Sequence, residues 1–286
     1  MKIVVTGASG FVGRYVAAEL ARHSVETTVV SRDAHRLADW SNTFGIVEMD
    51  LDDTDPGSFD LLGRPDVLVH LAWDGLPNYR SLHHFESELP RQFRFLKTLV
   101  EAGLPSLVVA GSCFEYGMQS GPLTEGMITQ PVNPYGHAKD ALRRELEFLR
   151  LANPFSLTWA RLFYMYGEGQ SPNSLYAQIA QAVLRGERRF NMSGGEQLRD
   201  YLPVAEVARL IVALVRQRCD LGVVNVCAGK PISVRSLVEG WLAEKGWNIE
   251  LNLGHYPYSD DEPMAFWGNA ERLLHHLSRH DCKSPD

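Results

Sequence analysis

Tyr135 and Lys139 stand four positions apart in a segment with a helical pattern. At this spacing both side chains lie on the same face of a helix. A free phenol, with a pKa of about 10, is a poor acid–base catalyst at neutral pH. A lysine ammonium beside it, together with an oxidised nicotinamide, favours the phenolate and lowers that pKa. The pair is therefore expected to move a proton to or from a carbinol oxygen while hydride moves at the carbon.

A serine, Ser112, stands where an apolar run ends at Ala110. If that run is a strand, the serine lies at its C-terminal end and can donate a hydrogen bond to a substrate carbonyl oxygen. The next residue, Cys113, is interpreted either as a small core residue or as an epimerisation base, since a thiolate can take an α-carbonyl proton.

The N-terminal segment has the pattern of a dinucleotide-binding turn. The β-branched run 2–5 is followed by glycines at positions 7, 10 and 13, and a helical pattern begins at Tyr15. The first glycine permits the tight turn, the second lets a pyrophosphate approach the backbone, and the third lets helix and strand pack closely. The helix N-terminus offers free N–H groups to the phosphates. The predicted contacts are Gly7, Ser9, Gly10, Phe11, Val12 and Gly13.

The end of the second predicted strand favours NADP(H), with NAD(H) as the alternative. An NAD enzyme normally has a carboxylate there to bind the ribose 2′-hydroxyl. This chain has Ser31 and Arg32, and Arg36 follows one helical turn later. Cations stabilise a 2′-phosphate and a carboxylate repels it. Asp33 weakens the argument unless it pairs with Arg36 at the start of a helix.

The fold that positions these residues can be predicted from the order of its elements. Strand and helix patterns alternate along the chain. This alternation predicts an α/β fold, a Rossmann-type doubly wound parallel sheet with a smaller C-terminal lobe. The predicted strands are 2–5, 26–30, 45–49, 66–70, 106–110, 158–162 and 222–226, and the predicted helices are 15–23, 88–101, 135–151, 175–186 and 234–245. We expect residues 1–165, rejoined by about 200–227, to bind the dinucleotide, and 166–199 and 228–286 to form the substrate lobe.

Bulk properties exclude several partners. With 286 residues, 45% of them hydrophobic, the chain can bury a large core. A net charge of −7 argues against nucleic acid and anionic membranes as the main partner. No apolar stretch approaches a membrane span. The widely spaced Cys113, Cys219, Cys227 and Cys282 are expected to be free thiols in a reducing cytoplasm. No metal is expected, and His275, His276 and His280 are interpreted as part of a solvated tail.

Taken together, the motifs resemble the extended short-chain dehydrogenase/reductases of the nucleotide-sugar epimerase and reductase group. The resemblance runs from residue 3 to about 235. It rests on the glycine pattern, Ser112 with Tyr116-Gly117, Tyr135 with Lys139, and the segments 161–167, 199–204 and 225–229. The chain departs from the family pattern at Tyr164 and Glu88, where asparagine is usual, and at Pro203, where histidine is usual.

The resemblance implies roles for individual residues. It implies Ser112, Tyr135 and Lys139 as the catalytic set. Further cofactor contacts implied by position are Asp50, Leu51, Leu71, Ala72, Tyr135, Lys139 and Leu162. Implied substrate contacts are Trp73, Tyr79, Ser112, Cys113, Phe114, Asn173, Phe190 and Arg199.

Four of these substrate contacts have a structural alternative. Trp73 and Tyr79 either wall the hexose pocket or belong to lobe packing. Phe190 either holds the base or lies in the core. Arg199 either pairs with the substrate diphosphate or forms a surface ion pair with Asp200.

Within the group, the chain is similar to 4-ketoreductases that form deoxytalose and deoxyfucose from dTDP-4-keto-6-deoxyhexoses. Cys113 and Phe114 lack the carboxylates that dehydration or decarboxylation would need. The alternatives are an NAD-retaining C4 epimerase and a non-catalytic NADP-binding scaffold. Relatives form dimers through the helices 88–101 and 135–151, and the apolar residues there either form a homodimer seam or face the sheet: Phe93, Leu96, Leu99, Leu142, Leu146 and Leu149.

Overall fold

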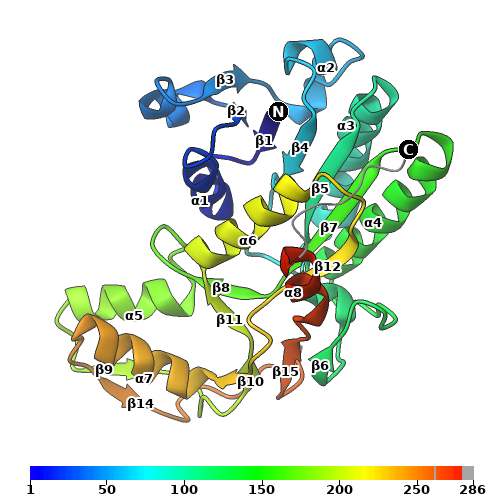
Figure 1. The fold of residues 1–286 in the computed structure, drawn as a ribbon. Helices are drawn as coiled ribbons and strands as arrows, with labels where there is room; N and C mark the ends of the chain where they lie inside the picture. Colours follow the sequence, from blue (N-terminus) through cyan, green and yellow to red (C-terminus); the bar gives the residue numbers. More distant parts are fainter. Residues whose placement is uncertain (261, 279–286) are drawn as a thin grey trace.

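The fold is built on one parallel sheet. A computed structural model describes residues 1–260 and 262–278 (Figure 1). Seven of the described strands form the sheet in the order β12-β7-β5-β4-β1-β2-β3, and every neighbouring pair is parallel. Their bounds are β1 (Lys2–Thr6), β2 (Glu26–Ser31), β3 (Gly45–Glu48), β4 (Val67–His70), β5 (Ser106–Ser112), β7 (Ser156–Leu162) and β12 (Gly222–Val226).

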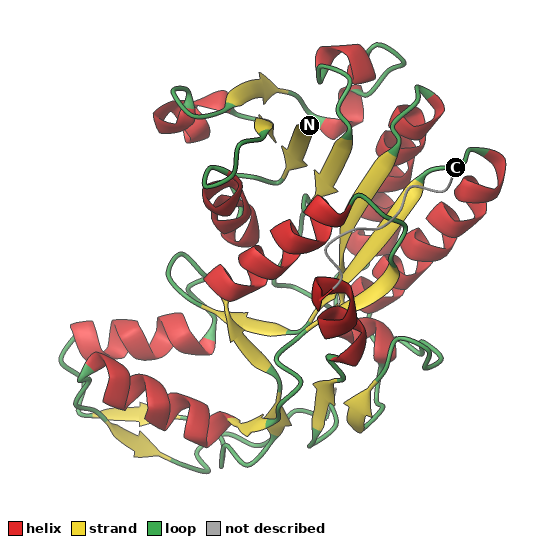
Figure 2. Cartoon of the chain, in the orientation of Figure 1, coloured by secondary structure: helices red, strands yellow, loops and turns green. Residues whose placement is uncertain are grey.

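Helices cover both faces of this sheet (Figures 1 and 2). On one face, α1 (Phe11–Leu20) and α6 (Val204–Gln217) share an apolar cluster with the sheet. On the other face, α3 (Leu89–Glu101) and α4 (Pro134–Ala152) do the same. Burying both faces explains why the strands are continuous β-branched runs without alternation. The predicted doubly wound α/β fold is confirmed.

Two local predictions need correction. The first helix begins at Phe11, four residues before the predicted start, with Gly10 as its N-cap and Gly13 inside its first turn. The glycines had masked the helical pattern, because glycine lowers helix propensity. Helix α6 was not predicted at all, although its apolar residues recur at helical spacing and eight of them are buried.

Two further helices and the short strands around them extend from the carboxyl side of the sheet (Figure 1). Helices α5 (Leu175–Leu184) and α7 (Val234–Lys245) pack with β9 (Arg189–Asn191) and β14 (Glu250–Asn252) around a separate apolar cluster. The other short elements are α2 (Ser58–Leu61), β6 (Gly121–Leu123), β8 (Tyr164–Tyr166), β10 (Leu198–Arg199), β11 (Tyr201–Pro203), β13 (Ile232–Ser233), β15 (Phe266–Gly268) and α8 (Glu271–Ser278).

The apolar residues considered for a dimer seam mostly face the sheet of their own chain. Leu96, Leu99, Leu142 and Leu146 are each fully buried, and Leu149 is nearly so. They pack in the cluster beneath α3 and α4, with Phe93 partly buried at its edge. These leucines are therefore core residues and offer no surface for a second copy.

The cysteine prediction is wrong at one position. Cys113 and Cys227 are free and buried, as expected, but Cys219 is disulfide-bonded. Separation in the sequence sets no distance between two thiols in the fold, and that distance decides whether a disulfide forms. Cys282 and His280 lie outside the described residues, whereas His275 and His276 lie on α8. Within the described ranges, every helix is too short or too polar to cross a bilayer.

The contact between α1 and the preceding turn predicts opposite effects of two glycine-to-alanine changes. A Cβ at Gly13 would lie 2.1 Å from the Gly7 carbonyl oxygen, whereas one at Gly240 in α7 would meet nothing within 4 Å. Gly13→Ala should lower the free energy of unfolding by about 2 kcal/mol through overpacking. Gly240→Ala should raise it by ~0.5–1 kcal/mol through helix propensity. Urea denaturation measures both. Equal effects of the two changes would contradict this account of the turn.

Candidate active site

Ser112 and Tyr135 lie near each other because the C-terminal end of β5 contacts the N-terminal end of α4. Ser112 is the last residue of β5 and caps a 3-10 turn, Cys113–Tyr116. Helix α4 begins beside this turn, and a Cβ at Gly136 would lie only 2.6 Å from the Phe114 carbonyl oxygen. The Ser112 side chain lies near enough to Tyr135 to lower the pKa of its phenol, against the larger effect of burial. The fold therefore brings the predicted serine and tyrosine side by side.

The Tyr135 ring lies within an aromatic enclosure. Ring centroids of His84, Tyr79, Trp73 and Phe114 lie 5.3, 5.4, 5.9 and 6.3 Å from its own. Burial in this enclosure raises the pKa of Tyr135, and Tyr79 adds to the effect. The protonated phenol is thus the stable form in the free protein, which suits a group that must give a proton to a carbonyl oxygen.

Lys139 reaches back toward the sheet from the next turn of α4. Its Nζ donates to the Ala110 carbonyl oxygen at 3.0 Å and lies 3.8 Å from the ring centroid of Trp73. Burial lowers the pKa of Lys139 to about 7, although Glu115 and Glu88 act in the opposite direction. At neutral pH the lysine is therefore divided between its charged and neutral forms.

A cavity of about 410 Å³ lies at the carboxyl ends of the first strands. Most predicted cofactor contacts line it: Gly7, Ser9, Gly10, Ser31, Arg32, Arg36, Asp50, Leu51, Leu71 and Ala72. Trp73, predicted as a substrate contact, also lines it, and so do residues that we did not predict: Thr6, Val30, Asp33, Met49, Asp74 and Arg91. Phe11, Val12, Gly13, Leu162, Tyr135 and Lys139 are not among its lining residues.

Arginine and aspartate side chains line this cavity where β2 ends. Asp33 accepts a hydrogen bond from the His35 amide, so its carboxylate caps a 3-10 helix. Its backbone oxygen accepts from the Ser31 hydroxyl at 2.9 Å. Arg32 pairs with Asp74 at 3.4 Å, while Arg36 also lines the cavity. The expected helix-start role of Asp33 is therefore present, through a backbone amide rather than through Arg36.

A buried hydrogen-bond chain beside the cavity was not anticipated from the sequence. The amide of Gln92 donates to Glu88, so its oxygen accepts from His70 Nε2 at 2.7 Å. His70 Nδ1 then accepts from the Thr6 hydroxyl at 2.8 Å. Glu88 also accepts from the Asp74 amide at 2.9 Å. Burial lowers the pKa of His70 to about 3, so this histidine stays neutral and links the cavity floor to α3.

Arg199 is already bound to a carboxylate. Its Nε and one terminal nitrogen lie 3.2 and 2.9 Å from Glu262 Oε2, and its guanidinium lies 4.5 Å from the Phe266 ring centroid. Asp200 instead accepts from the amides of Ala228 and Gly229. The alternative of an Arg199–Asp200 surface pair is therefore wrong. The two side chains diverge because neighbours on an extended chain point to opposite sides.

The other predicted substrate contacts divide into two groups. Tyr79 and Phe114 lie beside Tyr135, with their ring centroids 4.9 Å apart. Phe190 is buried in the cluster around α5 and α7, and Asn173 is exposed before α5. Cys113 is buried, and burial raises the pKa of its thiol. This favours the core interpretation of Cys113 over the epimerisation base.

Comparisons with known proteins agree with this geometry. A family model described as "NAD dependent epimerase/dehydratase family" matches residues 3–227. The dTDP-6-deoxy-L-talose 4-dehydrogenase (NAD(+)) of Aggregatibacter actinomycetemcomitans is 29% identical over 270 residues, 94% of this chain and 99% of that protein. The GDP-6-deoxy-D-talose 4-dehydrogenase of the same organism is 25% identical over 283 residues, 97% of this chain and 91% of that protein.

A solved structure, MoeE5 in complex with UDP-glucuronic acid and NAD, is also similar. It is 26% identical, has a TM-score of 0.81, and the match covers 100% of this chain and 95% of that one. The similarity therefore extends over the whole chain, the part beyond residue 227 included.

The burial of Lys139 predicts a pH-dependent stability difference. Its pKa of about 7 in the fold lies below the unfolded value of 10.5. Burying the charge thus costs stability below pH 7, and this cost falls as the pH rises from 7 toward 10.5. Lys139→Met should be more stable than the wild type at pH 6, and by pH 9 this advantage should shrink by on the order of 2 kcal/mol. Urea denaturation at both pH values measures this. A constant difference would contradict a lowered pKa.

Proposed function

Because the chain belongs to the NAD dependent epimerase/dehydratase family, we propose that it reduces the C4 keto group of a nucleotide-activated 4-keto-6-deoxyhexose, with dTDP as the nucleotide. The observation that carries this proposal is the placement of the Ser112 side chain beside Tyr135, with Lys139 one turn later, in a chain similar over 94% and 97% of its length to two deoxytalose 4-dehydrogenases. A dehydrogenase of a carbinol catalyses the same hydride transfer as a ketoreductase in the reverse direction.

The residues around the cavity fit a nicotinamide dinucleotide. A Cβ at Gly7 would lie 2.6 Å from the Ala72 backbone nitrogen, so backbone rather than side chain borders the cavity at this turn. Gly10 caps the N-terminus of α1, whose amides favour a phosphate. When bound, the cofactor supplies the hydride.

The chain's own residues manage the proton. Ser112 donates a hydrogen bond to the C4 oxygen and holds the carbonyl against the face that receives hydride. Tyr135 transfers its phenolic proton to that oxygen as negative charge develops there, which leaves a phenolate. Lys139, in its ammonium form, stabilises the phenolate until a proton from solvent restores it. The aromatic enclosure around Tyr135 limits access of bulk water.

The residues 166–199 and 228–286 are proposed to hold the nucleotide sugar. Their apolar cluster around α5 and α7 is separate from the two clusters of the sheet. Tyr166, Tyr176 and Trp241 in this cluster have ring centroids 4.9–5.7 Å apart. A well-packed lobe on the carboxyl side of the sheet can form one wall of a cleft, and the second substrate would bind between this lobe and the sheet.

NADPH is proposed as the preferred reductant, since Arg32 and Arg36 line the cavity and the Asp33 carboxylate caps a helix. Fluorescence titration should give a dissociation constant about tenfold lower for NADPH than for NADH. Arg36→Ala should weaken NADPH binding and leave NADH binding within twofold. Tighter binding of NADH by the wild type would overturn this preference, and it would agree with the NAD named for the talose dehydrogenase.

The proposed activity predicts consumption of NADPH when the protein is mixed with dTDP-4-keto-6-deoxyglucose, before or after a 3,5-epimerase is added. Absorbance at the reduced-nicotinamide band measures the rate. Dependence on the added epimerase would assign the L-sugar series. No consumption with either sugar, together with NAD that copurifies with the protein, would favour a C4 epimerase that retains its cofactor. Cofactor binding with neither activity would favour the scaffold.

Tyr135→Phe is the control for this assay. It removes the proton donor but keeps the ring that packs against Tyr79 and Trp73. Turnover should fall by at least about 100-fold while the dissociation constant of NADPH changes less than twofold. Turnover at the wild-type rate would remove Tyr135 from the mechanism.

A further inference from the structure

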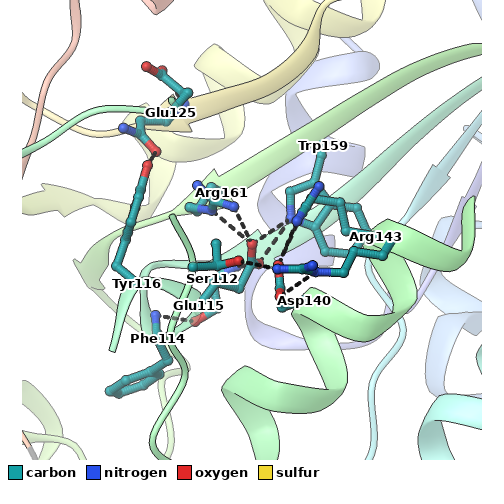
Figure 3. Close-up of polar contacts among 12 residues, drawn as sticks. Ser112, Phe114, Glu115, Tyr116, Glu125, Asp140, Arg143, Trp159 and Arg161 are labelled. Atoms are coloured by element: carbon teal, nitrogen blue, oxygen red, sulfur yellow. Dashed lines mark hydrogen bonds and ion pairs between the residues drawn. The ribbon is translucent and has the colours of Figure 1, made fainter. Parts of the chain in front are cut away.

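Glu115 is a fully buried carboxylate directly behind the catalytic serine (Figure 3). Its Oε1 accepts from the Ser112 amide at 2.7 Å and from Trp159 Nε1 at 2.9 Å. Its Oε2 accepts from Arg161 Nε at 2.8 Å and lies 2.7 Å from a terminal nitrogen of the same guanidinium. Both oxygens of Glu115 are therefore engaged by donors from β5 and β7.

The backbone around this carboxylate is shaped to receive it. Gly111 lies opposite Arg161 in the β5–β7 register. A Cβ at Gly111 would stand 2.1 Å from Trp159 Nε1 and 2.7 Å from Glu115 Oε1. Since neither approach is tolerable, the absence of a side chain at residue 111 is what lets the Glu115–Trp159 hydrogen bond form. The site is built from three segments rather than being a chance ion pair.

The same contacts orient the Ser112 side chain. Ser112 and Glu115 form a capping box, in which the serine oxygen accepts from the Phe114 amide at 3.2 Å while the glutamate accepts from the serine amide. With its oxygen accepting from the turn, the serine hydroxyl proton is available to Tyr135 or to a substrate oxygen. A rotation of the Ser112 peptide would break both halves of the box.

Arg161 is held from its other side as well. Its guanidinium carbon lies 4.4 Å from the Tyr116 ring centroid, and the Tyr116 hydroxyl donates to Asn225 Oδ1 at 2.8 Å. The cation and the carboxylate therefore neutralise each other in a place that excludes water. Hydrogen bonds to Glu115 on one side and the Tyr116 ring on the other restrict Arg161 to one arrangement, and the ion pair transmits that arrangement to the groups it contacts.

We propose that Glu115 is a positioning residue: its carboxylate, fixed by Trp159 and Arg161, sets the orientation of the Ser112 peptide and so directs the serine hydroxyl at the reacting oxygen. This inference rests on the proposed function wherever its test measures turnover, because those experiments need a substrate. Glu115 does not act as an acid or base, because its oxygens are occupied and the residue is fully buried.

The variant Glu115→Gln distinguishes a role in positioning Ser112 from a merely structural role. Glutamine has one acceptor oxygen, so when that oxygen faces Arg161 its NH₂ group confronts the Ser112 amide. We expect kcat to fall about 100-fold, as for a small misplacement of a catalytic group, with KM and the dissociation constant of NADPH within twofold of wild type. Asp140→Asn is the matched control. Asp140 is also buried and bonded to two arginines, Arg143 and Arg144, and its variant should keep kcat within twofold. An equal loss of kcat in both variants would overturn the proposal.

A double-mutant cycle identifies the residue through which Glu115 acts. In a Ser112→Ala background there is no hydroxyl to orient, so Glu115→Gln should lower kcat less than twofold further. A merely structural carboxylate would produce the same fold-loss in both backgrounds, and that result would contradict the proposal. If Glu115→Gln fails to fold, the double variant Glu115→Gln/Arg161→Gln takes its place in the cycle. The second substitution removes the arginine charge that would otherwise be buried without a partner.

Hydrogen exchange tests the geometry without any substrate. The Ser112 amide donates to Glu115, so in the wild type and in Asp140→Asn it should exchange at least about tenfold more slowly than in Glu115→Gln. Unchanged exchange in Glu115→Gln would overturn the positioning role, whatever the enzyme's substrate. Inactivity of the wild type toward 4-keto sugars with the expected exchange pattern would overturn the proposed function alone.

Discussion

A buried ion pair between Glu115 and Arg161 joins the turn that follows β5 to the neighbouring strand β7. Removing two charges from water is costly, and the cost is offset only where hydrogen bonds occupy the remaining polar atoms. Here Trp159 and the Ser112 amide complete the carboxylate's shell. The 3-10 turn after Ser112 is fixed by this arrangement, and α4 begins against that turn. The places of Tyr135 and Lys139 follow from it.

The candidate site buries an ionisable side chain at a position where an apolar side chain would make the fold more stable. Lys139 is fully buried beside the Trp73 ring, and burial lowers its pKa to about 7. A core leucine would cost less there, because it carries no charge to desolvate. In the proposed mechanism, the lysine and the protonated phenol of Tyr135 act when charge develops on a substrate oxygen. Active sites of enzymes commonly lower the stability of the fold in this way, because the residues that the chemistry needs are not those that stabilise the fold best.

The substrate side differs from what the family resemblance implies. An arginine that is already bound by a carboxylate is a weaker ligand for a second anion, and Arg199 is bound by Glu262 while its guanidinium packs on Phe266. A diphosphate role for Arg199 would therefore require exchange of one anion for another. Tyr164, where the family has asparagine, stands in the same group of rings, 5.1 Å from Tyr201. Tyr164, Tyr201 and Phe266 thus form an aromatic wall around Arg199.

The sequence by itself determined the features that depend on neighbours along the chain. Spacing placed Tyr135 and Lys139 on one helical face, Gly7 and Gly10 at the turn between β1 and α1, and the apolar runs in parallel strands. Only the tertiary structure decided which distant groups meet: Glu115 with Trp159, 44 residues apart, and Arg199 with Glu262, 63 apart. It also decided that the leucines of α3 and α4 face the sheet. The physical reason is that periodicity records local geometry, whereas burial and pairing depend on segments whose approach no local pattern encodes.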